Sequence, residues 1–260
     1  KSLDSRLPPA DVLLHCGDFS LDSGRRKKDR DAQTSFDRWL AAQPHPIKLV
    51  VRGNHDSMNW KFPKSEATYF LRNQVVVIRK NDVDVVLYVS PHGGYRQADV
   101  PANCDVFATH APPNGLLDLT YNGQRAGSSI LKSLTKDWEP ATPSTAEADK
   151  VKEGPKVWVC GHIHESSGAA FFELAAKQER PDVPPDAKEM GSSTSETLLL
   201  NAANANEGKA RYLVRPPMMF GFDLNKQGGG VEKEDHEVPE DLAKPVLPSS
   251  SLRDSVRWPG

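Results

Sequence analysis

Five side chains that can bind a metal ion each follow a short apolar stretch of this sequence. They are the carboxylate of Asp18, the amide of Asn54 and the imidazoles of His110, His162 and His164. Carboxylate and amide oxygens and imidazole nitrogens are ligands that Mn, Fe and Zn accept. Singly, each motif fits a plainer role, since Gly-Asp suits any turn and one histidine is more often structural. The set of motifs together therefore predicts a metal site.

The apolar stretches that precede these residues are predicted to be strands, because they are short, apolar and bounded by turn residues. These four strands are expected at residues 12–14, 47–51, 105–108 and 157–160. Helical spacing of apolar residues predicts helices at 34–42 and 128–134. Further strands are expected at 75–78, 83–89, 169–174, 197–200 and 212–214.

Apolar strands that alternate with helices predict an α/β fold, a layered β-sandwich flanked by helices. In such sheets, ligands collect outside the carboxyl ends of the strands, where the four polar motifs would converge. The later strands have short connections, so we expect them to form an antiparallel second sheet. Glycines next to the candidate ligands, Gly17, Gly53 and Gly161, are expected to let the backbone turn sharply beside an ion.

Composition limits the organisation and the function classes of the chain. Its 260 residues suit one domain at 1–225, with polar insertions near 139–155 and 178–195 and a disordered tail at 226–260. A net charge of −2 and one short basic run, 25–28, which we interpret as a solvated loop, argue against binding long nucleic acid. Three cysteines and the lack of a membrane-spanning or secretion segment predict a cytoplasmic protein without membrane contact.

Taken in order, the motifs resemble the signature of the calcineurin-like metallophosphoesterase superfamily. The matching segments are Gly17-Asp18, Gly53-Asn54-His55-Asp56, Thr109-His110-Ala111-Pro112-Pro113 and Gly161-His162-Ile163-His164. Segments 11–19, 201–204 and 215–220 are similar to the subgroup of class III cyclic-nucleotide phosphodiesterases. The resemblance runs from about residue 8 to residue 224, outside the insertions, and it implies a four-layer α/β/β/α fold.

The resemblance also implies a dinuclear centre of two divalent transition metals, Mn, Fe or Zn, bridged by Asp18. It assigns one metal to His164 and the other to Asn54, His110 and His162. His55 would face the phosphoryl group and either stabilise the developing charge or protonate the leaving oxygen. Asn54 and His55 would bind substrate, and His92 would reach the phosphate unless it belongs to an ordinary glycine-rich turn.

The sequence departs from the family pattern at its first motif, an Asp-x-His on a strand before Gly17. No histidine precedes His15, and side chains three apart on a strand point to opposite faces, so His15 is expected to face away from Asp18. We expect that the working protein carries residues before Lys1 that supply this motif. The alternative is a natural variant that holds one metal or none.

We therefore predict a metal-dependent hydrolase that cleaves a phosphodiester or phosphomonoester by attack of a metal-bridging hydroxide. Its partner would be a small phosphoester, nucleotides included, and the oligomeric state stays open. Two alternatives remain: a degenerate family member with an incomplete metal site that acts as a binding protein, and metal-assisted chemistry on a non-nucleotide metabolite.

Overall fold

The computed structural model describes residues 7–20, 26–138, 154–173, 196–205, 215, 217–222, 231–232 and 256–257. Within them, strands form a three-stranded sheet, a seven-stranded sheet and a two-stranded ribbon. The ribbon pairs β10 (Gly221–Phe222) with β11 (Val231–Glu232). No helix among the described residues combines the length and apolar character needed to cross a membrane.

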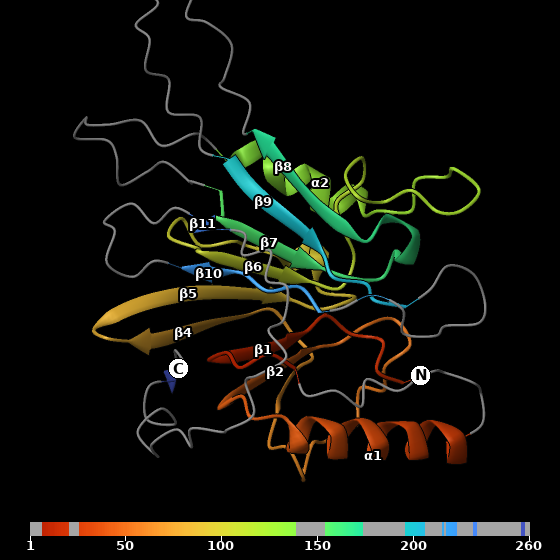
Figure 1. Ribbon diagram of the computed structural model, residues 1–260. Coiled ribbons are helices and arrows are strands. Elements are labelled where there is room, and N and C mark those ends of the chain that lie inside the picture. Colours follow the sequence, from red (N-terminus) through yellow and green to blue (C-terminus); the bar gives the residue numbers. More distant parts are fainter. Residues whose placement is uncertain are drawn as a thin grey trace, which may run out of the picture.

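The three-stranded sheet is parallel throughout and has the order β1-β2-β3. It consists of β1 (Val12–His15), β2 (Ile47–Val51) and β3 (Thr68–Phe70). Helix α1 (Arg26–Ala42) connects β1 to β2, as a parallel pair requires. Leu40 of α1 packs with Val50 and Phe62, so the helix covers the outer face of this sheet. Figure 1 shows α1 beneath β1 and β2.

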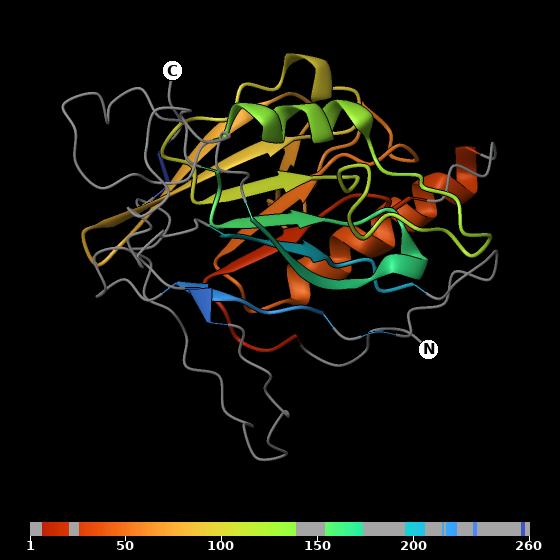
Figure 2. The ribbon, with the colours of Figure 1, turned by 90° about the horizontal axis from the view of Figure 1, so that it is seen from above.

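The seven-stranded sheet is mixed and has the order β12-β4-β5-β6-β7-β9-β8. Its strands are β4 (Gln74–Lys80), β5 (Val83–Ser90), β6 (Val106–Thr109), β7 (Val157–Cys160), β8 (Gly168–Glu173), β9 (Glu196–Asn201) and β12 (Val256–Arg257). The inner strands β5, β6, β7 and β9 are parallel, whereas β4, β8 and β12 pair antiparallel. Helix α2 (Ser129–Leu134) lies over this sheet in Figure 2.

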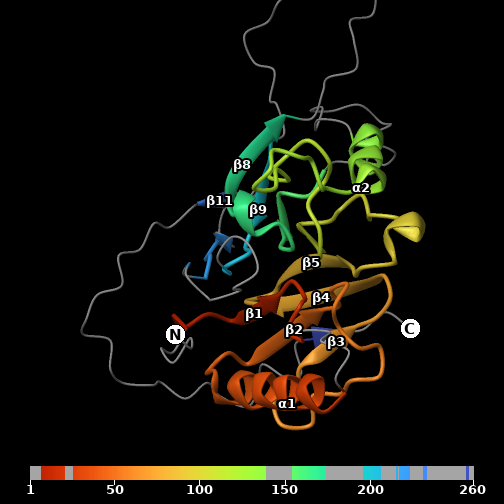
Figure 3. The same ribbon diagram turned by 90° about the vertical axis from the view of Figure 1, so that its right-hand side faces the viewer.

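The two sheets face each other across the main core, and strand alternation explains which side chains fill it. On β6, Val106 and Ala108 point into the core between the sheets, whereas Phe107 points toward α2. On β7, Val157 and Val159 point inward and Trp158 outward in the same way. The result is the expected four-layer α/β/β/α arrangement, with α1 and α2 as the outer layers (Figure 3).

Two expectations about these elements are wrong. The motif-bearing strands are divided between the sheets, with β1 and β2 in one and β6 and β7 in the other, and neither sheet is antiparallel throughout. Strand order depends on contacts between distant segments, which local periodicity does not contain. The basic run at 25–28 was also expected to be a solvated loop, but α1 begins at Arg26, so most of the run is helical. Arg and Lys favour helices, but a polar first turn gives no apolar period.

Several expected segments fall largely outside the described residues. These are the strand at 212–214, most of the insertions near 139–155 and 178–195, and most of the tail at 226–260. Within that tail, the described residues 231–232 and 256–257 form the short strands β11 and β12. The strands expected at 12–14, 47–51, 105–108 and 157–160 are confirmed within one residue at each end.

A buried carboxylate on α1 gives a test of how the outer layer is held. Asp37 is 2% exposed and accepts hydrogen bonds from the backbone N–H groups of Lys64 and Ser65 at 3.0 and 2.9 Å. Asp37→Ala leaves these donors unpaired, so we expect the free energy of unfolding in urea to fall by about 1–3 kcal/mol. Asp31→Ala, at an exposed position of the same helix, is the control. Equal effects of the two substitutions would contradict this role.

Candidate metal centre

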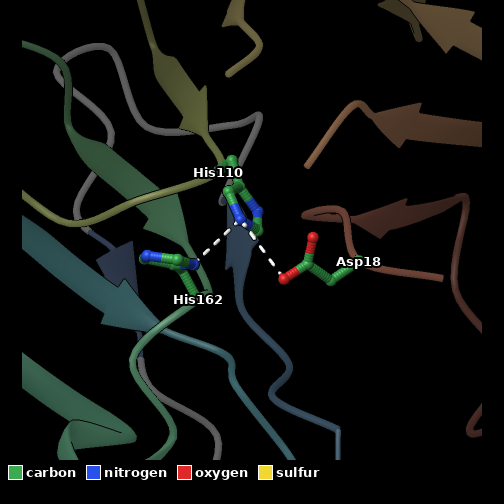
Figure 4. Close-up of side chains that lie close together, drawn as sticks. All are labelled: Asp18, His110 and His162. Carbon is green, nitrogen blue, oxygen red and sulfur yellow. Dashed lines mark hydrogen bonds and ion pairs between the residues drawn. The ribbon is translucent and has the colours of Figure 1, made fainter. Parts of the chain in front are cut away.

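Loops that follow β1, β2, β6 and β7 bring four predicted ligands together. Asp18, His110 and His162 offer ligand atoms that all lie within 4.8 Å of one another. His110 Nε2 lies 3.1 Å from His162 Nδ1 and 3.5 Å from Asp18 Oδ2, and dashed lines in Figure 4 mark these two contacts. Asn54 Oδ1 lies 2.8 Å from the same His110 nitrogen. The carboxylate and the two imidazoles thus reach one point from both sheets.

The tautomer of His110 is set by the backbone of the neighbouring loop. His110 is fully buried, and its Nδ1 lies 2.7 Å from the carbonyl oxygen of Cys16, to which it donates its proton. In a neutral imidazole, Nε2 then carries a lone pair. Metal-binding histidines commonly donate their second ring N–H in this way, which orients the ring and raises its basicity. His110 is therefore oriented for binding an ion through Nε2.

Burial keeps the imidazoles of this cluster neutral. It lowers the pKa of His162 to about 4, with a further contribution from His110, and it lowers the pKa of His110 against the opposing effect of Asp18. The lone pair on His110 Nε2 therefore faces the oxygen atoms Asn54 Oδ1 and Asp18 Oδ2, and these atoms repel one another. A divalent cation relieves such repulsion, and nitrogen and oxygen donors of this kind suit Mn, Fe or Zn. The residues present fit a metal ion.

The Asp18 loop is held in a strained conformation by close backbone contact. Asp18 has a φ of 63°, a region that non-glycine residues rarely occupy. A Cβ on Gly17 would lie 2.6 Å from the backbone nitrogen of Gly53, so glycine is required where the two loops meet. Gly161 has more room, because its nearest neighbour, the Cβ of Cys16, would lie at 3.4 Å. The expected need for glycine thus applies to Gly17 and Gly53.

Asp56, which sequence reasoning had not assigned to the site, joins the two ligand loops. It is 4% exposed and accepts hydrogen bonds from the backbone N–H groups of Asp18, Gly53 and Ser20 at 2.7, 2.8 and 3.0 Å. Burial raises the pKa of Asp56 to about 6, while hydrogen bonds from Ser20 and Gly53 lower it. Its place in the segment Gly53-Asn54-His55-Asp56 was the available sequence signal.

The remaining predicted residues surround this cluster at greater distance. The His92 ring lies 6.1 Å from that of His110, measured between centroids, so His92 borders the site. His55 donates its backbone N–H to Asp18 Oδ1 at 3.0 Å. Burial, with a further contribution from the Arg52 charge, lowers the pKa of His92. His164 lies in a short 3-10 turn, His164–Ser166, outside the group of three ligands.

The loop that carries His92 is tied to the metal loops by Arg52, a second residue that sequence reasoning missed. Its Nη1 donates to the carbonyl oxygen of His92 at 2.7 Å, and its Nε donates to that of Asp56 at 3.2 Å. A second contact holds the same loop, because the Tyr95 hydroxyl accepts a hydrogen bond from the backbone N–H of Ala111, next to His110, at 3.0 Å. Arg52 directly precedes the glycine of the second motif, but that position alone does not indicate a bridging role.

The side chain of His15, beside the cluster, lies on the face of β1 that its position in the strand predicts. The His15 ring packs on Phe36 of α1 with centroids 4.7 Å apart, as a side chain on the outer face of β1 would. Cys16 is a buried core residue, and burial raises the pKa of its thiol to about 12, so it is a poor nucleophile. Asp18, His55, His162 and His164 line a cavity of about 770 Å³ that continues between the sheets.

Removal of the Asp56 carboxylate tests whether it holds the ligand loops. We expect Asp56→Ala to lower the free energy of unfolding by about 2–4 kcal/mol, because three backbone donors, two of them in buried residues, lose their acceptor. We also expect the affinity for Co²⁺ to fall about 10- to 100-fold, as for residues that orient metal ligands. Urea unfolding and Co²⁺ titration measure the two effects. Asp37→Ala, equally buried but distant, should change stability alone, and unchanged Co²⁺ affinity in Asp56→Ala would contradict this role.

Comparison with known proteins places these motifs in a family. Residues 2–166 match the family model described as calcineurin-like phosphoesterase, and this range contains every predicted ligand. The chain is 28% identical over 193 residues to probable rhamnogalacturonate lyase C of Emericella nidulans, covering 62% of this chain and 16% of that protein. It is 26% identical over 207 residues to human metallophosphoesterase domain-containing protein 1, covering 63% of this chain and 57% of that protein.

A third relative is UPF0046 protein K07C11.7 of Caenorhabditis elegans, 23% identical over 245 residues, or 82% of this chain and 69% of that protein. The chain spans less than two thirds of the length of the first two relatives, so their overall activities do not carry over directly. The family model, however, covers more than half of this chain and includes the clustered residues. The protein belongs to the calcineurin-like phosphoesterase family, a family of metal-dependent phosphoesterases.

Proposed function

We propose that this protein hydrolyses a small phosphodiester or phosphomonoester at the cluster of Asp18, Asn54, His110 and His162. The observation that carries the proposal is the meeting of oxygen and nitrogen ligand atoms around His110 Nε2, at 2.8 to 3.5 Å. A phosphoester is anionic, so its binding beside Asp18 needs compensating positive charge. Family membership supports the same reaction class.

The residues that would hold the two proposed metal ions are Asp18, Asn54, His110, His162 and His164. Manganese is our first choice of metal, with iron and zinc as alternatives, because all three accept mixed oxygen and nitrogen ligands. Divalent cations at such a site neutralise the phosphoryl oxygens and activate the attacking water. Nothing among the described side chains near Asp18 is needed as a nucleophile.

Two further histidines are placed to act on the substrate. His55 follows Asn54 directly and lines the cavity beside Asp18, so it can protonate the leaving oxygen or stabilise its charge. His92 borders the cluster, and the N–H of its neutral imidazole can donate to a phosphoryl oxygen. Arg52 fixes both backbone groups of His92. The Arg52 carbonyl oxygen accepts from the His92 N–H at 3.0 Å, and the Arg52 side chain donates to the His92 carbonyl oxygen.

The adjoining cavity of about 770 Å³ lies within the size range of ligand pockets. Its walls between the sheets are apolar, so an anionic ester such as a nucleotide would bind with its phosphate at the end beside Asp18 and His55. Similarity to the cyclic-nucleotide subgroup favours a phosphodiester. A non-nucleotide metabolite carrying a phosphate would meet the same chemical requirements and remains an alternative substrate.

One observation favours a second candidate function, that of a binding protein with an incomplete metal site. The observation is that His164, which the family resemblance pairs with Asp18 at one of the two ions, lies outside the cluster of Asp18, His110 and His162. Metal bound without hydrolysis would support this second function.

The two functions separate in an assay of the metal-stripped chain reloaded with Mn²⁺. We expect release of p-nitrophenol from bis-p-nitrophenyl phosphate or from p-nitrophenyl phosphate, and a loss of at least about 100-fold in kcat/KM for Asp18→Asn. The matched control is Asp82→Asn, since Asp82 is exposed in the β4–β5 turn and has a similar φ of 61°. Its activity should be unchanged.

Either of two results would contradict the hydrolase. One is the absence of turnover of both esters when the metal is bound in full occupancy. The other is equal activity of Asp18→Asn and the unaltered protein, which would place the reaction elsewhere. Because Asn is tolerated at positive φ, loss of activity in Asp18→Asn reports on the carboxylate rather than on backbone strain.

A further inference from the structure

Asn201 at the end of β9 is a fully buried amide with contacts to three separate carbonyl groups. Its Nδ2 lies 2.8 Å from the carbonyl oxygen of Ile163, 3.1 Å from that of Ser166 and 3.2 Å from that of Leu117. Its Oδ1 accepts from the backbone N–H of Ala203 at 3.2 Å. An amide nitrogen carries two protons, so the three carbonyls share them. All polar capacity of Asn201 is directed at backbone.

Two of these carbonyls belong to the turn that carries His162. This residue has a φ of 70°, and a non-glycine residue in this region is strained by about 1–2 kcal/mol. Strain of this kind persists where neighbouring contacts determine the conformation. On one side of His162, Cys160 pairs with Asn201 in the sheet, and on the other side the Asn201 amide binds Ile163. His162 thus lies between two points fixed by the same residue.

The third carbonyl joins a second strained segment to this turn. Leu117 also has a positive φ, of 48°, and its carbonyl oxygen accepts from Asn201. The next residues approach the same turn, because Ser166 Oγ donates to the carbonyl oxygen of Leu119 at 2.8 Å. Asn201 therefore fixes the His162 turn relative to β9 and to the loop around Leu117.

From these contacts we infer that Asn201 is a positioning residue for the metal centre. It holds the His162 turn so that Nδ1 faces His110 and Asp18 in advance of metal binding. A ligand held in place loses less conformational freedom when the ion arrives, so the affinity for the ion is higher. This inference rests on the metal site of the proposed function, and metal affinity, measured without any substrate, is its readout.

The competing explanation is that Asn201 serves only the stability of the fold. Any buried amide with satisfied hydrogen bonds contributes to stability, so a change in unfolding alone does not distinguish the two roles. Thr197 on the same strand provides the comparison. It is 1% exposed and donates its hydroxyl proton to the carbonyl oxygen of Pro155 at 2.7 Å, toward the opposite end of β9.

The test compares Asn201→Asp with Thr197→Val in the full chain, stripped of metal and titrated with Co²⁺. Asp keeps the shape of Asn and can still accept from Ala203, but its carboxylate cannot donate to the three carbonyls. We expect Co²⁺ to bind about 10- to 100-fold more weakly to Asn201→Asp, with altered visible absorption bands. Thr197→Val should bind Co²⁺ within about twofold of the unaltered protein, because it changes the same strand far from the ligands.

Circular dichroism shows whether each variant is folded, and Co²⁺ binding by the folded variants then decides between the two roles. A folded Asn201→Asp that binds Co²⁺ as the unaltered protein does would overturn the positioning role while leaving the proposed metal site intact. Should Asn201→Asp not fold, Asn201→Ser, which keeps one donor, decides in its place. Failure of both to fold would also overturn the inference, since Asn201 would then serve the fold itself. An unaltered protein that binds no Co²⁺ would contradict the metal site.

Discussion

The structure depends on one electrostatic constraint, the gathering of ligand atoms that repel one another in a buried place. His110 is inaccessible to solvent, and its Nε2 lies within 3.5 Å of Asn54 Oδ1, His162 Nδ1 and Asp18 Oδ2. The lone pair of Nε2 and the two oxygen atoms are unfavourable neighbours in a medium of low dielectric, where Coulomb energies are large. A cation bound among these atoms would attract all of them, and the arrangement would then stabilise the protein. The loops must therefore be held in place by something other than the ligands themselves.

Buried hydrogen bonds to the backbone supply that support on both sides of the cluster. The Asp56 carboxylate holds Asp18 and Gly53 through their N–H groups, and the Cys16 carbonyl holds His110. Two of the clustered residues, Asp18 and His162, have positive φ values, a region that non-glycine residues rarely occupy. Strain at ligands is tolerated where the surrounding structure determines the conformation. The four layers provide this rigidity because both sheets are packed on both faces.

Much of the site could be predicted because its residues lie directly after apolar strands. The spacing of Asp18 after β1 and of His110 after β6 is a local property, and carboxyl ends of parallel strands are where ligands collect. Division of these strands between two sheets was not predicted, since order within a sheet depends on long-range packing. The start of α1 at Arg26 was missed because its first turn lacks an apolar period.

Supporting residues were harder to recognise than ligands. Asp56 and Asn201 are ordinary polar residues in sequence, and their roles follow from burial and from backbone donors and acceptors that lie far away in the chain. Asp56 lies inside a recognised motif, so its position was the one signal available for it. Hydrogen-bond geometry, rather than residue type, distinguishes them from surface residues.

The most direct test of this account is thermal unfolding of the metal-stripped chain with and without Mn²⁺ or Zn²⁺, together with the bound metal content and X-ray absorption of the ion. The account predicts at least one ion per chain with imidazole nitrogen and oxygen ligands. It also predicts an increase in stability of about 2.7 kcal/mol when the free ion is at 100 times its dissociation constant. Absence of bound ion with an unchanged unfolding temperature would contradict the claim that these ligand atoms gather around a cation.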